Sequence, residues 1–292
     1  MCWNRPYGYD TRASRLPTLY LKTVVWEFVL KKPSRPSVPS SSYDEPYYLK
    51  HMDGADEFVR FQGQYVSSRL RYILQLVHIQ SGKRVLELGC GRGEATWQCA
   101  RLGNYATGLD FSSTALHIAS ELRARASEQG LCMDLTQASA YHLPFASDSF
   151  DSVLMLDVVE HLNPEELLDT LAEVRRTLCP GGRAIVHTMP NTWYYKIGYP
   201  LFRVVLRLRG KRMPADPRER WGYREVHVNE QNLILLGREL RESGFKAKAW
   251  LYSTESYAEE PNKYVRFMMR ALVTIYPFRW FFCNDIFAIA TK

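Results

Sequence analysis

The stretch Arg84-Val-Leu-Glu-Leu-Gly-Cys-Gly-Arg-Gly-Glu94 decides the fold of this 292-residue chain. Its first apolar residues predict a short buried strand, and the three glycines after them, Gly89, Gly91 and Gly93, predict a tight turn. The residues that follow, from Glu94 to Leu102, have helical character. A strand, a glycine turn and a helix in this order place backbone N–H groups and a helix N-terminus over one site, which suits a nucleotide-like ligand.

Further features support a ligand site beside this turn. Glu87 precedes the first glycine by two residues, and Asp110 ends the next predicted strand, where a carboxylate can accept two ribose hydroxyls. Two longer motifs follow. Residues 143–162 read LPFASDSFDSVLMLDVVEHL, and residues 178–186 read LCPGGRAIV.

In this order the motifs resemble the class I S-adenosylmethionine-dependent methyltransferases, above all the subgroup that modifies small molecules, quinones and lipids. The resemblance covers roughly residues 81–190. It implies an α/β, Rossmann-like methyltransferase fold, with a doubly wound, mostly parallel sheet of seven strands whose seventh strand is antiparallel at the sheet edge. It also implies S-adenosyl-L-methionine as the cofactor and methyl transfer as the reaction.

The resemblance assigns roles to residues of this chain. Glu87 and the glycine turn border the methionine part of the cofactor, Asp110 holds the ribose hydroxyls, and Phe111 lies against the adenine. Asp157 closes the fourth strand at the end that faces the cofactor. The cofactor-binding residues expected in this way are Glu87, Gly89, Cys90, Gly91, Gly93, Asp110, Phe111, Ser139, Ala140 and Asp157.

Ser139 marks a departure from the family pattern. Relatives commonly have an aspartate about four residues before Leu-Pro-Phe, where it accepts a hydrogen bond from the adenine amino group. A serine hydroxyl can still accept that bond, but more weakly than a carboxylate. The backbone N–H of Ala140 is the second expected contact to the adenine edge.

Two histidines are candidate general bases. His161 follows the fourth strand by one turn, and His227 lies in an insertion after the fifth strand, where this family builds its acceptor pocket. A histidine titrates near neutral pH and can accept a hydroxyl proton. The fourth strand does not end in the N-P-P-Y or D-P-P-Y motif used on nucleobase amines, so a DNA substrate is not expected. The seven histidines show no metal-ligand spacing, and no metal is expected.

The sequence predicts an N-terminal appendage with a Pro/Ser-rich linker at 1–42, a helical lid or lead-in at 43–80 and a methyltransferase domain at 81–292. Insertions at about 191–228 and 253–280 interrupt the domain. A helix after Pro200 would place Leu201, Val204, Val205 and Leu208 on one face and arginines on another. Such a helix suits either an anionic lipid surface or the cap of an apolar acceptor pocket.

Composition sets the remaining expectations. The formal net charge of +7 indicates either solubility or anionic partners. Six scattered cysteines without a C-x-x-C pair, and no signal peptide or spanning segment, predict a cytoplasmic protein that can contact a membrane peripherally. The predicted partner is a small-molecule or lipid-like acceptor, methylated at a hydroxyl, and the chain can also form a homodimer. The alternatives are an N- or C-methyltransferase, a cofactor-binding scaffold without turnover, and an RNA enzyme.

Overall fold

The computed structural model describes residues 38–52, 54–77, 81–210, 212–216, 226–254, 257 and 260–292. Of the predicted appendage at 1–42, the residues before 38 lie outside this range. The described cysteines, at positions 90, 99, 132, 179 and 283, are free thiols.

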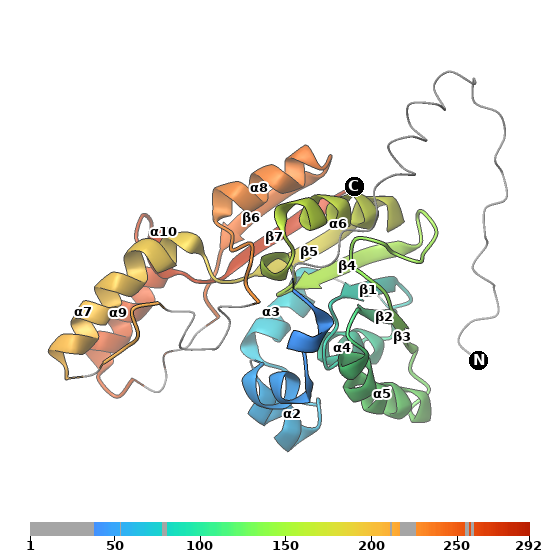
Figure 1. Cartoon of the computed structure of the whole chain (residues 1–292), viewed down its shortest axis with the longest axis horizontal. Helices are drawn as coiled ribbons and strands as arrows, with labels where there is room; N and C mark the ends of the chain where they lie inside the picture. The colour runs from blue at the N-terminus through green and yellow to red at the C-terminus, as the bar shows by residue number, and fades with distance from the viewer. Residues whose placement is uncertain are drawn as a thin grey trace.

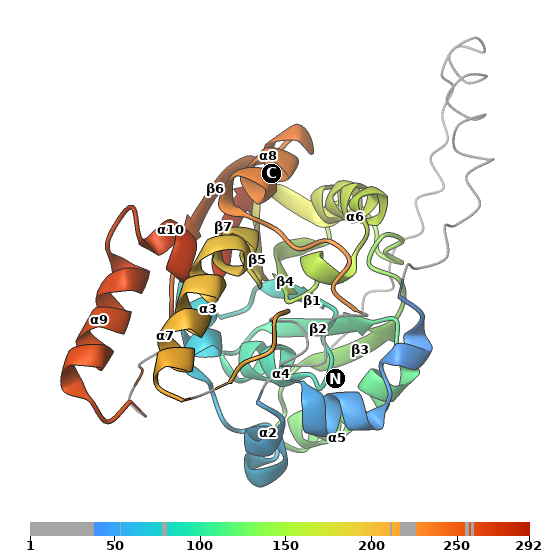
Figure 2. The ribbon, with the colours of Figure 1, turned by 60° about the vertical axis from the view of Figure 1, so that its left-hand side comes forward.

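A seven-stranded sheet forms the centre of the chain (Figures 1 and 2). The strand order is β3-β2-β1-β4-β5-β7-β6, and the first five strands in this order are parallel. The predicted doubly wound, mostly parallel sheet is therefore confirmed. The strands are β1 (Arg84–Leu88), β2 (Tyr105–Asp110), β3 (Met133–Gln137), β4 (Phe150–Leu156), β5 (Leu178–Thr188), β6 (Lys246–Leu251) and β7 (Ile286–Thr291).

The position of the seventh strand differs from the prediction. β7 is antiparallel to both β5 and β6 and lies between them, so β6 and not β7 forms the edge of the sheet. Five of the six residues of β7, from Ile286 to Ala290, form a continuous apolar run, and four of these five are fully buried. A strand buried on both faces needs a neighbour on each side, which explains the inner position.

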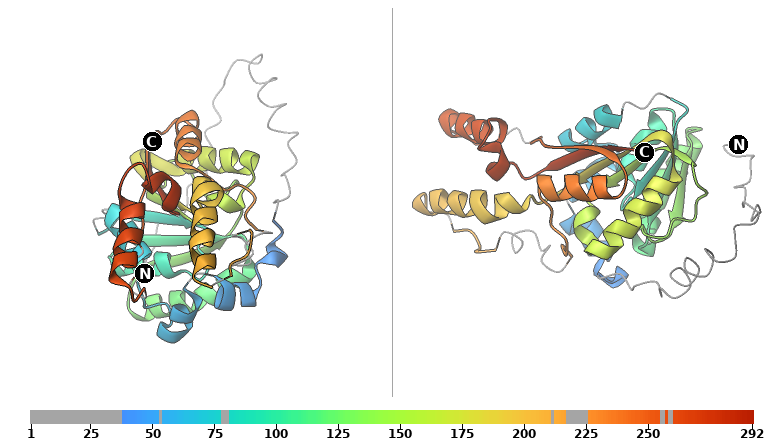
Figure 3. Two further views of the ribbon diagram at one scale, coloured as in Figure 1. Left: turned by 90° about the vertical axis from the view of Figure 1, so that its left-hand side faces the viewer. Right: turned by 90° about the horizontal axis from the view of Figure 1, so that it is seen from above.

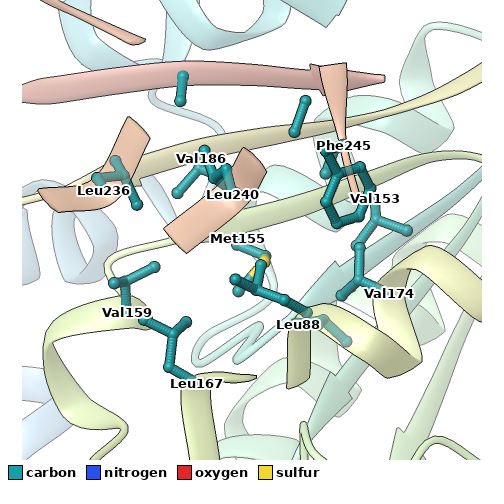
Figure 4. Close-up of a cluster of buried hydrophobic side chains, with 14 of the residues drawn as sticks. Leu88, Val153, Met155, Val159, Leu167, Val174, Val186, Leu236, Leu240 and Phe245 are labelled. Carbon is teal, nitrogen blue, oxygen red and sulfur yellow. The ribbon is translucent and has the colours of Figure 1, made fainter. Parts of the chain in front are cut away.

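Helices cover both faces of the sheet (Figure 2). On one face α6 (Pro164–Thr177) and α8 (Leu233–Glu242) enclose an apolar cluster, which Figure 4 shows. On the other face α3 (Ser68–Val77), α4 (Glu94–Arg101) and α5 (Ser113–Glu128) enclose a second cluster around Trp97, with α2 (Ala55–Phe61) packed beside it through Phe58. The labelled residues of the first cluster are Leu88, Val153, Met155, Val159, Leu167, Val174, Val186, Leu236, Leu240 and Phe245.

Local sequence explains where α6 begins and which face it buries. Asn163 caps the helix through a reciprocal pair of hydrogen bonds with Glu166, and Pro164 occupies the first turn, where its missing N–H costs nothing. Leu167, Leu171 and Val174 are buried as the spacing predicts. Leu168 is 47% exposed, because it lies about 100° around the helix from Leu167.

The two predicted insertions form a pair of arms that extend away from the sheet (Figures 1 and 3). The first carries a π-helical turn (Tyr194–Gly198) and α7 (Tyr199–Leu208); the second carries α9 (Lys263–Thr274) and α10 (Arg279–Phe282). The arms meet at their base. There Trp193 stacks on Trp280, and the Asn191 side-chain amide donates to the carbonyls of Trp280 and Cys283.

Candidate functional site

The carboxyl ends of four parallel strands meet at one edge of the sheet. Gly89 follows β1, Asp110 ends β2, Asp157 follows β4, and His187 lies at the end of β5. The backbone N–H of Asp157 donates to the carbonyl of His187, so the β4 and β5 ends are held together. In open α/β sheets, ligands bind outside this edge.

A cavity of about 1480 Å³ opens at this edge and continues between the two arms. Its inner wall includes the glycine turn, Asp110 and Asp157. Its outer part is lined by apolar side chains from α7 and α9. Typical small-molecule sites enclose roughly 300–1,000 Å³, so one cofactor would not fill this cavity. The residues that face it from the two helices are Leu201, Phe202, Val205, Leu206, Val265, Met268, Met269, Leu272 and Val273.

Asp110 is fixed by backbone groups on both of its carboxylate oxygens. The N–H of Gly91 donates to Oδ2 at 2.9 Å, and the N–H of Ser112 donates to Oδ1 at 2.9 Å. Burial raises the pKa of Asp110, and these two donors act against that rise. A carboxylate has about four acceptor sites, so two remain for a ligand in the cavity.

The geometry of the turn explains why glycine occupies positions 89 and 91. Both have positive φ, of 64° and 51°. A Cβ on Gly89 would lie 2.6 Å from Cγ2 of Val158, which closes the turn to any larger residue. Gly91 lies on the cavity wall and presents its N–H to Asp110.

The structure divides the sequence-predicted residues into two groups. Three lie behind the cavity wall, and nine form part of it. The three behind it are Glu87, Cys90 and Gly93. The nine on the wall are Gly89, Gly91, Asp110, Phe111, Ser139, Ala140, Asp157, His161 and His227.

The residues behind the wall support the turn. Glu87 is buried and accepts a hydrogen bond from the Thr96 hydroxyl of α4, and burial raises its pKa to about 8. The Cys90 sulfur packs against Gly108 of β2, and burial raises the pKa of this thiol well above its usual range. Gly93 caps α4 where a Cβ would approach Ala119. Glu87 therefore does not line the cavity itself, and it affects the site only by supporting the glycine turn.

Asp157 lies at the centre of a charged network on the wall. It has a positive φ of 55°, which is uncommon for a residue other than glycine and tends to occur at functional sites. One carboxylate oxygen lies 3.2 Å from Arg69 Nη2, and the other lies 2.7 Å from Nδ1 of the fully buried His187. His187 Nε2 lies 3.2 Å from a carboxylate oxygen of Asp285.

Ion pairing outweighs burial in this network. Burial alone would lower the pKa of His187, but Asp157 and Asp285 raise it to about 9. Burial would raise the pKa of Asp157, but Arg69 and His187 hold it far below its usual value. The pKa of Glu160 is raised to about 8 by burial and by the charge of Asp157, and the charge of His187 counteracts this rise only in part.

The two candidate bases lie next to each other although they are distant in the sequence. The N–H groups of Val228 and Asn229 both donate to the backbone carbonyl of Glu160, which anchors this part of the insertion to the end of β4. The rings of His161 and His227 are consequently 4.9 Å apart, edge to face. His227 lies on the cavity wall, and its place in an acceptor pocket stays a prediction.

His161 is a neutral imidazole. Burial lowers its pKa to about 4, and the charge of Asp157 counteracts this only in part. Its Nδ1 lies 3.1 Å from the carbonyl oxygen of Val226 and 3.0 Å from the Tyr43 hydroxyl. A carbonyl can only accept, so it favours the tautomer protonated at Nδ1, which leaves Nε2 as a proton acceptor.

Glu160, His161 and His227 also have the geometry of a cation site. One ligand-type atom from each lies within 4.8 Å of those of the other two. Nitrogen and carboxylate ligands at this separation suit a divalent transition metal. The spacing in the sequence gave no sign of this group, because the fold alone brings His227 to His161.

The sequence reasoning missed three residues of the site. Tyr43 covers the opening, in edge contact with Phe111 at 5.4 Å and with His161 at 5.8 Å. His187 and Asp285 complete the network around Asp157. His187 had a detectable signal, because a histidine at the carboxyl end of an otherwise apolar strand points to the ligand edge. Asp285 and Tyr43 had none, since only tertiary structure brings them to this edge.

Comparison with known proteins agrees with the fold. Residues 86–186 match the family described as a methyltransferase domain. The ubiquinone biosynthesis O-methyltransferase of Nitrosococcus oceani is 34% identical over 125 residues, which cover 42% of this chain and 50% of that protein. Methyltransferase GfsG of Streptomyces halstedii is 31% identical over 116 residues, 39% of this chain and 40% of that protein. The chain thus spans about half the length of these relatives or less.

Solved structures show the same fold at low sequence identity. Phosphoethanolamine N-methyltransferase 2 of Haemonchus contortus, in complex with S-adenosyl-L-methionine, superposes with a TM-score of 0.58 at 16% identity, over 87% of this chain and 60% of that one. An S-adenosylmethionine-dependent methyltransferase from Mesorhizobium loti gives a TM-score of 0.54 at 18% identity, over 77% and 98% of the two chains.

Proposed function

We propose that this chain transfers the methyl group of S-adenosylmethionine to a hydroxyl of a small, lipid-like acceptor. The proposal starts from its class I S-adenosylmethionine-dependent methyltransferase domain. One observation carries the proposal. A single cavity joins the ligand edge of the sheet, with Asp110 and Asp157 on its wall, to an apolar groove between α7 and α9. This arrangement suits a polar cofactor at one end and an apolar acceptor at the other.

The residues present fit S-adenosylmethionine. Asp110 has two free acceptor sites for the ribose hydroxyls, and Gly91 brings bare backbone to the cavity. Phe111 and Ser139 line the wall next to Asp110, as the proposed adenine site requires. The cofactor supplies the activated methyl group, so the protein has to align the acceptor and accept its proton.

His227 is the proposed general base. It lines the cavity, and only 8% of it is exposed. His161, whose Nδ1 already contacts Val226 and Tyr43, is the second candidate. The amide hydrogen bonds that Val228 and Asn229 donate to Glu160 hold the backbone next to His227 in place.

His227→Ala should lower turnover by about 100-fold or more, because a positioned base contributes at least that much to hydroxyl deprotonation. Cofactor affinity should change by less than about threefold, since His227 is not among the residues proposed to hold the cofactor. Steady-state methyl transfer and calorimetric titration with S-adenosylmethionine measure the two quantities. Unchanged turnover would move the role to His161 or to an acceptor that needs no base.

A chelator control separates proton transfer from metal binding. If His227 acts as a base, treatment with EDTA should leave the wild-type rate unchanged. Loss of activity with EDTA, restored by a divalent cation, would instead assign Glu160, His161 and His227 as ligands.

The proposed reaction is tested with matched acceptors. Calorimetry should first show micromolar binding of both S-adenosylmethionine and its demethylated product. Hydroxylated aromatic acceptors that differ only in the length of an apolar chain should then show KM falling by about three- to fourfold for each buried methylene, up to the length of the groove. Mass spectrometry of the product identifies the methylated atom. Cofactor binding without turnover on any acceptor would favour a scaffold, and a methylated nitrogen or carbon would contradict the hydroxyl assignment.

Location and assembly remain predictions. No helix among the described residues is long and apolar enough to cross a bilayer. A cytoplasmic location, peripheral membrane contact and a homodimer are each compatible with the proposed reaction, and the first two are consistent with a lipid-like acceptor.

A further inference from the structure

The two arms expose the most accessible large apolar side chains of the described chain. Leu208 at the end of α7 is 84% exposed, and Tyr264 and Phe267 near the start of α9 are 74% and 73% exposed. No other large apolar side chain among the residues that the structure describes exceeds 59%. A cluster of this kind on one protruding feature marks a binding surface.

Leu208 is the last residue of α7, and Tyr264 and Phe267 lie in the first turns of α9. α7 runs outward and α9 runs back, and the two lie side by side in Figures 1, 2 and 3. Arg209, one residue beyond α7, lies 4.0 Å from Glu260, just before α9. The outer end of α7 is therefore next to the first turn of α9, and the lining of the cavity extends to Arg209 and Glu260 there.

The helical segments of the arms are strongly basic, and the acidic residues of the insertions, Glu260 among them, lie just outside these segments. Residues 199–214 and 261–284 hold nine arginines and lysines and no aspartate or glutamate. The whole chain carries +7, so the remainder of the chain, at +7 minus +9, carries a net charge of −2. The positive charge of the protein is thus concentrated where its apolar residues are most exposed.

We infer that the tips of the two arms dock on an anionic phospholipid bilayer, with the groove between α7 and α9 opening toward the lipid. Leu208, Tyr264 and Phe267 enter the headgroup region, and the flanking arginines and lysines contact lipid phosphates. The docking does not depend on the reaction. The entry of the acceptor from the bilayer through the groove rests on the proposed function.

Charge argues against the other occupants of this surface. A symmetric dimer pairs the same patch with itself, so nine positive charges of one copy would face nine of the other. A nucleic acid would complement the charge and could stack bases on Tyr264 and Phe267, but it gains nothing from the aliphatic Leu208 or from the apolar groove. An anionic bilayer complements both.

The test uses the full chain and sedimentation with vesicles of phosphatidylcholine alone or with one quarter phosphatidylglycerol. Binding is expected only to the anionic vesicles and should weaken as salt rises, because the charge attraction is screened. Leu208→Glu combined with Phe267→Glu should lower vesicle affinity by at least about 100-fold, since two apolar anchors are lost and two negative charges added. Arg207→Glu combined with Arg270→Glu should lower it by at least about 30-fold.

A matched control tests the location. Val59 and Ile234 are each 59% exposed and lie on α2 and α8. Val59→Glu combined with Ile234→Glu adds the same charge and should leave vesicle binding unchanged. S-adenosylmethionine affinity, measured on all variants, should stay at the wild-type value, which shows that each variant is folded and keeps its cofactor site.

Several results would overturn the inference. Wild-type protein that ignores anionic vesicles, or arm variants that bind as wild type, would contradict it directly. Gel filtration that shows a wild-type dimer and monomeric arm variants would assign the surface to a second copy. Salt-dependent binding to RNA without vesicle binding would assign it to nucleic acid. Vesicle binding together with absent methyl transfer would leave the docking intact and refute only the proposed function.

Discussion

Asp110→Asn is expected to weaken the binding of S-adenosylmethionine and of its demethylated product by at least about 100-fold, because hydrogen bonds to a charged group contribute about 1.5–3 kcal/mol and two ribose hydroxyls would lose this acceptor. The loss should be equal for both ligands, since they share the ribose. In the wild type, Gly91 and Ser112 fix each carboxylate oxygen by a backbone N–H at 2.9 Å. The remaining acceptor sites are therefore held in one orientation.

The same substitution should also destabilise the turn. An amide has one oxygen, so either Gly91 or Ser112 would face an NH₂ group and lose its partner. A buried N–H without a partner costs about 1–3 kcal/mol, and a lower unfolding temperature is expected. Calorimetry must therefore be carried out below the unfolding range of the variant.

Asp134→Asn provides the matched control. Asp134 lies in the neighbouring strand β3, but its side chain is exposed and contributes nothing to the cavity wall. This variant should keep both affinities within about twofold, because it removes one surface charge and no ligand contact. A loss of less than about threefold in folded Asp110→Asn would contradict the proposed ribose site.

The sequence predicted the framework of the fold because local signals were strong. The apolar run before Gly89 predicted β1, and the acid at Asp110 marked the end of β2. The order of the last two strands in the sheet was harder to predict from the sequence. β6 and β7 are both short, and only the burial of β7 on both faces shows that it lies inside the sheet.

The candidate site was predictable wherever a residue follows a parallel strand directly. Gly89, Asp110 and Asp157 belong to this class, and all three reach the cavity wall. The closeness of His161 and His227 depends on an insertion that folds back onto the carbonyl of Glu160. The hydrophobic periodicity of the sequence gives no information about such a long-range contact. The division of the chain into appendage, lead-in and domain stays a prediction.

Asp157→Asn is expected to have the largest effect on stability. The carboxylate lies 3.2 Å from Arg69 and 2.7 Å from the fully buried His187. Removing one member of a buried ion pair costs about 3–5 kcal/mol, because its partner keeps an uncompensated charge. A quarter of the Asp157 side chain is exposed, so we expect the substitution to lower the free energy of unfolding by about 3 kcal/mol at pH 6.5. Denaturant unfolding measures this difference.

The size of this effect should depend on pH. His187 has a folded-state pKa of about 9, above its unfolded value near 6.5, so its contribution is complete below pH 6.5 and is lost as pH rises through 9. Asp157 itself stays ionised throughout this range, because its pKa is lowered. Wild-type stability should therefore fall between pH 6.5 and 9.5.

The variant should lose less stability over the same interval. Without Asp157, one of the charges that raise the pKa of His187 is lost, so its imidazole loses its proton at a lower pH. The pKa of Glu160 drops as well, because the charge of Asp157 is one cause of its rise to about 8. Both changes reduce the number of protons that the folded state releases as the pH is raised. The difference in free energy of unfolding between wild type and variant should therefore narrow as pH rises.

Asp151→Asn separates the network from the general loss of a carboxylate. Asp151 lies at the other end of β4 and pairs with Arg84 at 3.4 Å, far from His187. Its pKa is lowered, so it stays ionised over the tested interval, and its substitution should cost the same at pH 6.5 and at pH 9.5. A gap for Asp157→Asn that is equally independent of pH would mean that His187 is neutral in the folded protein, and that Arg69 alone holds Asp157 at the cavity wall.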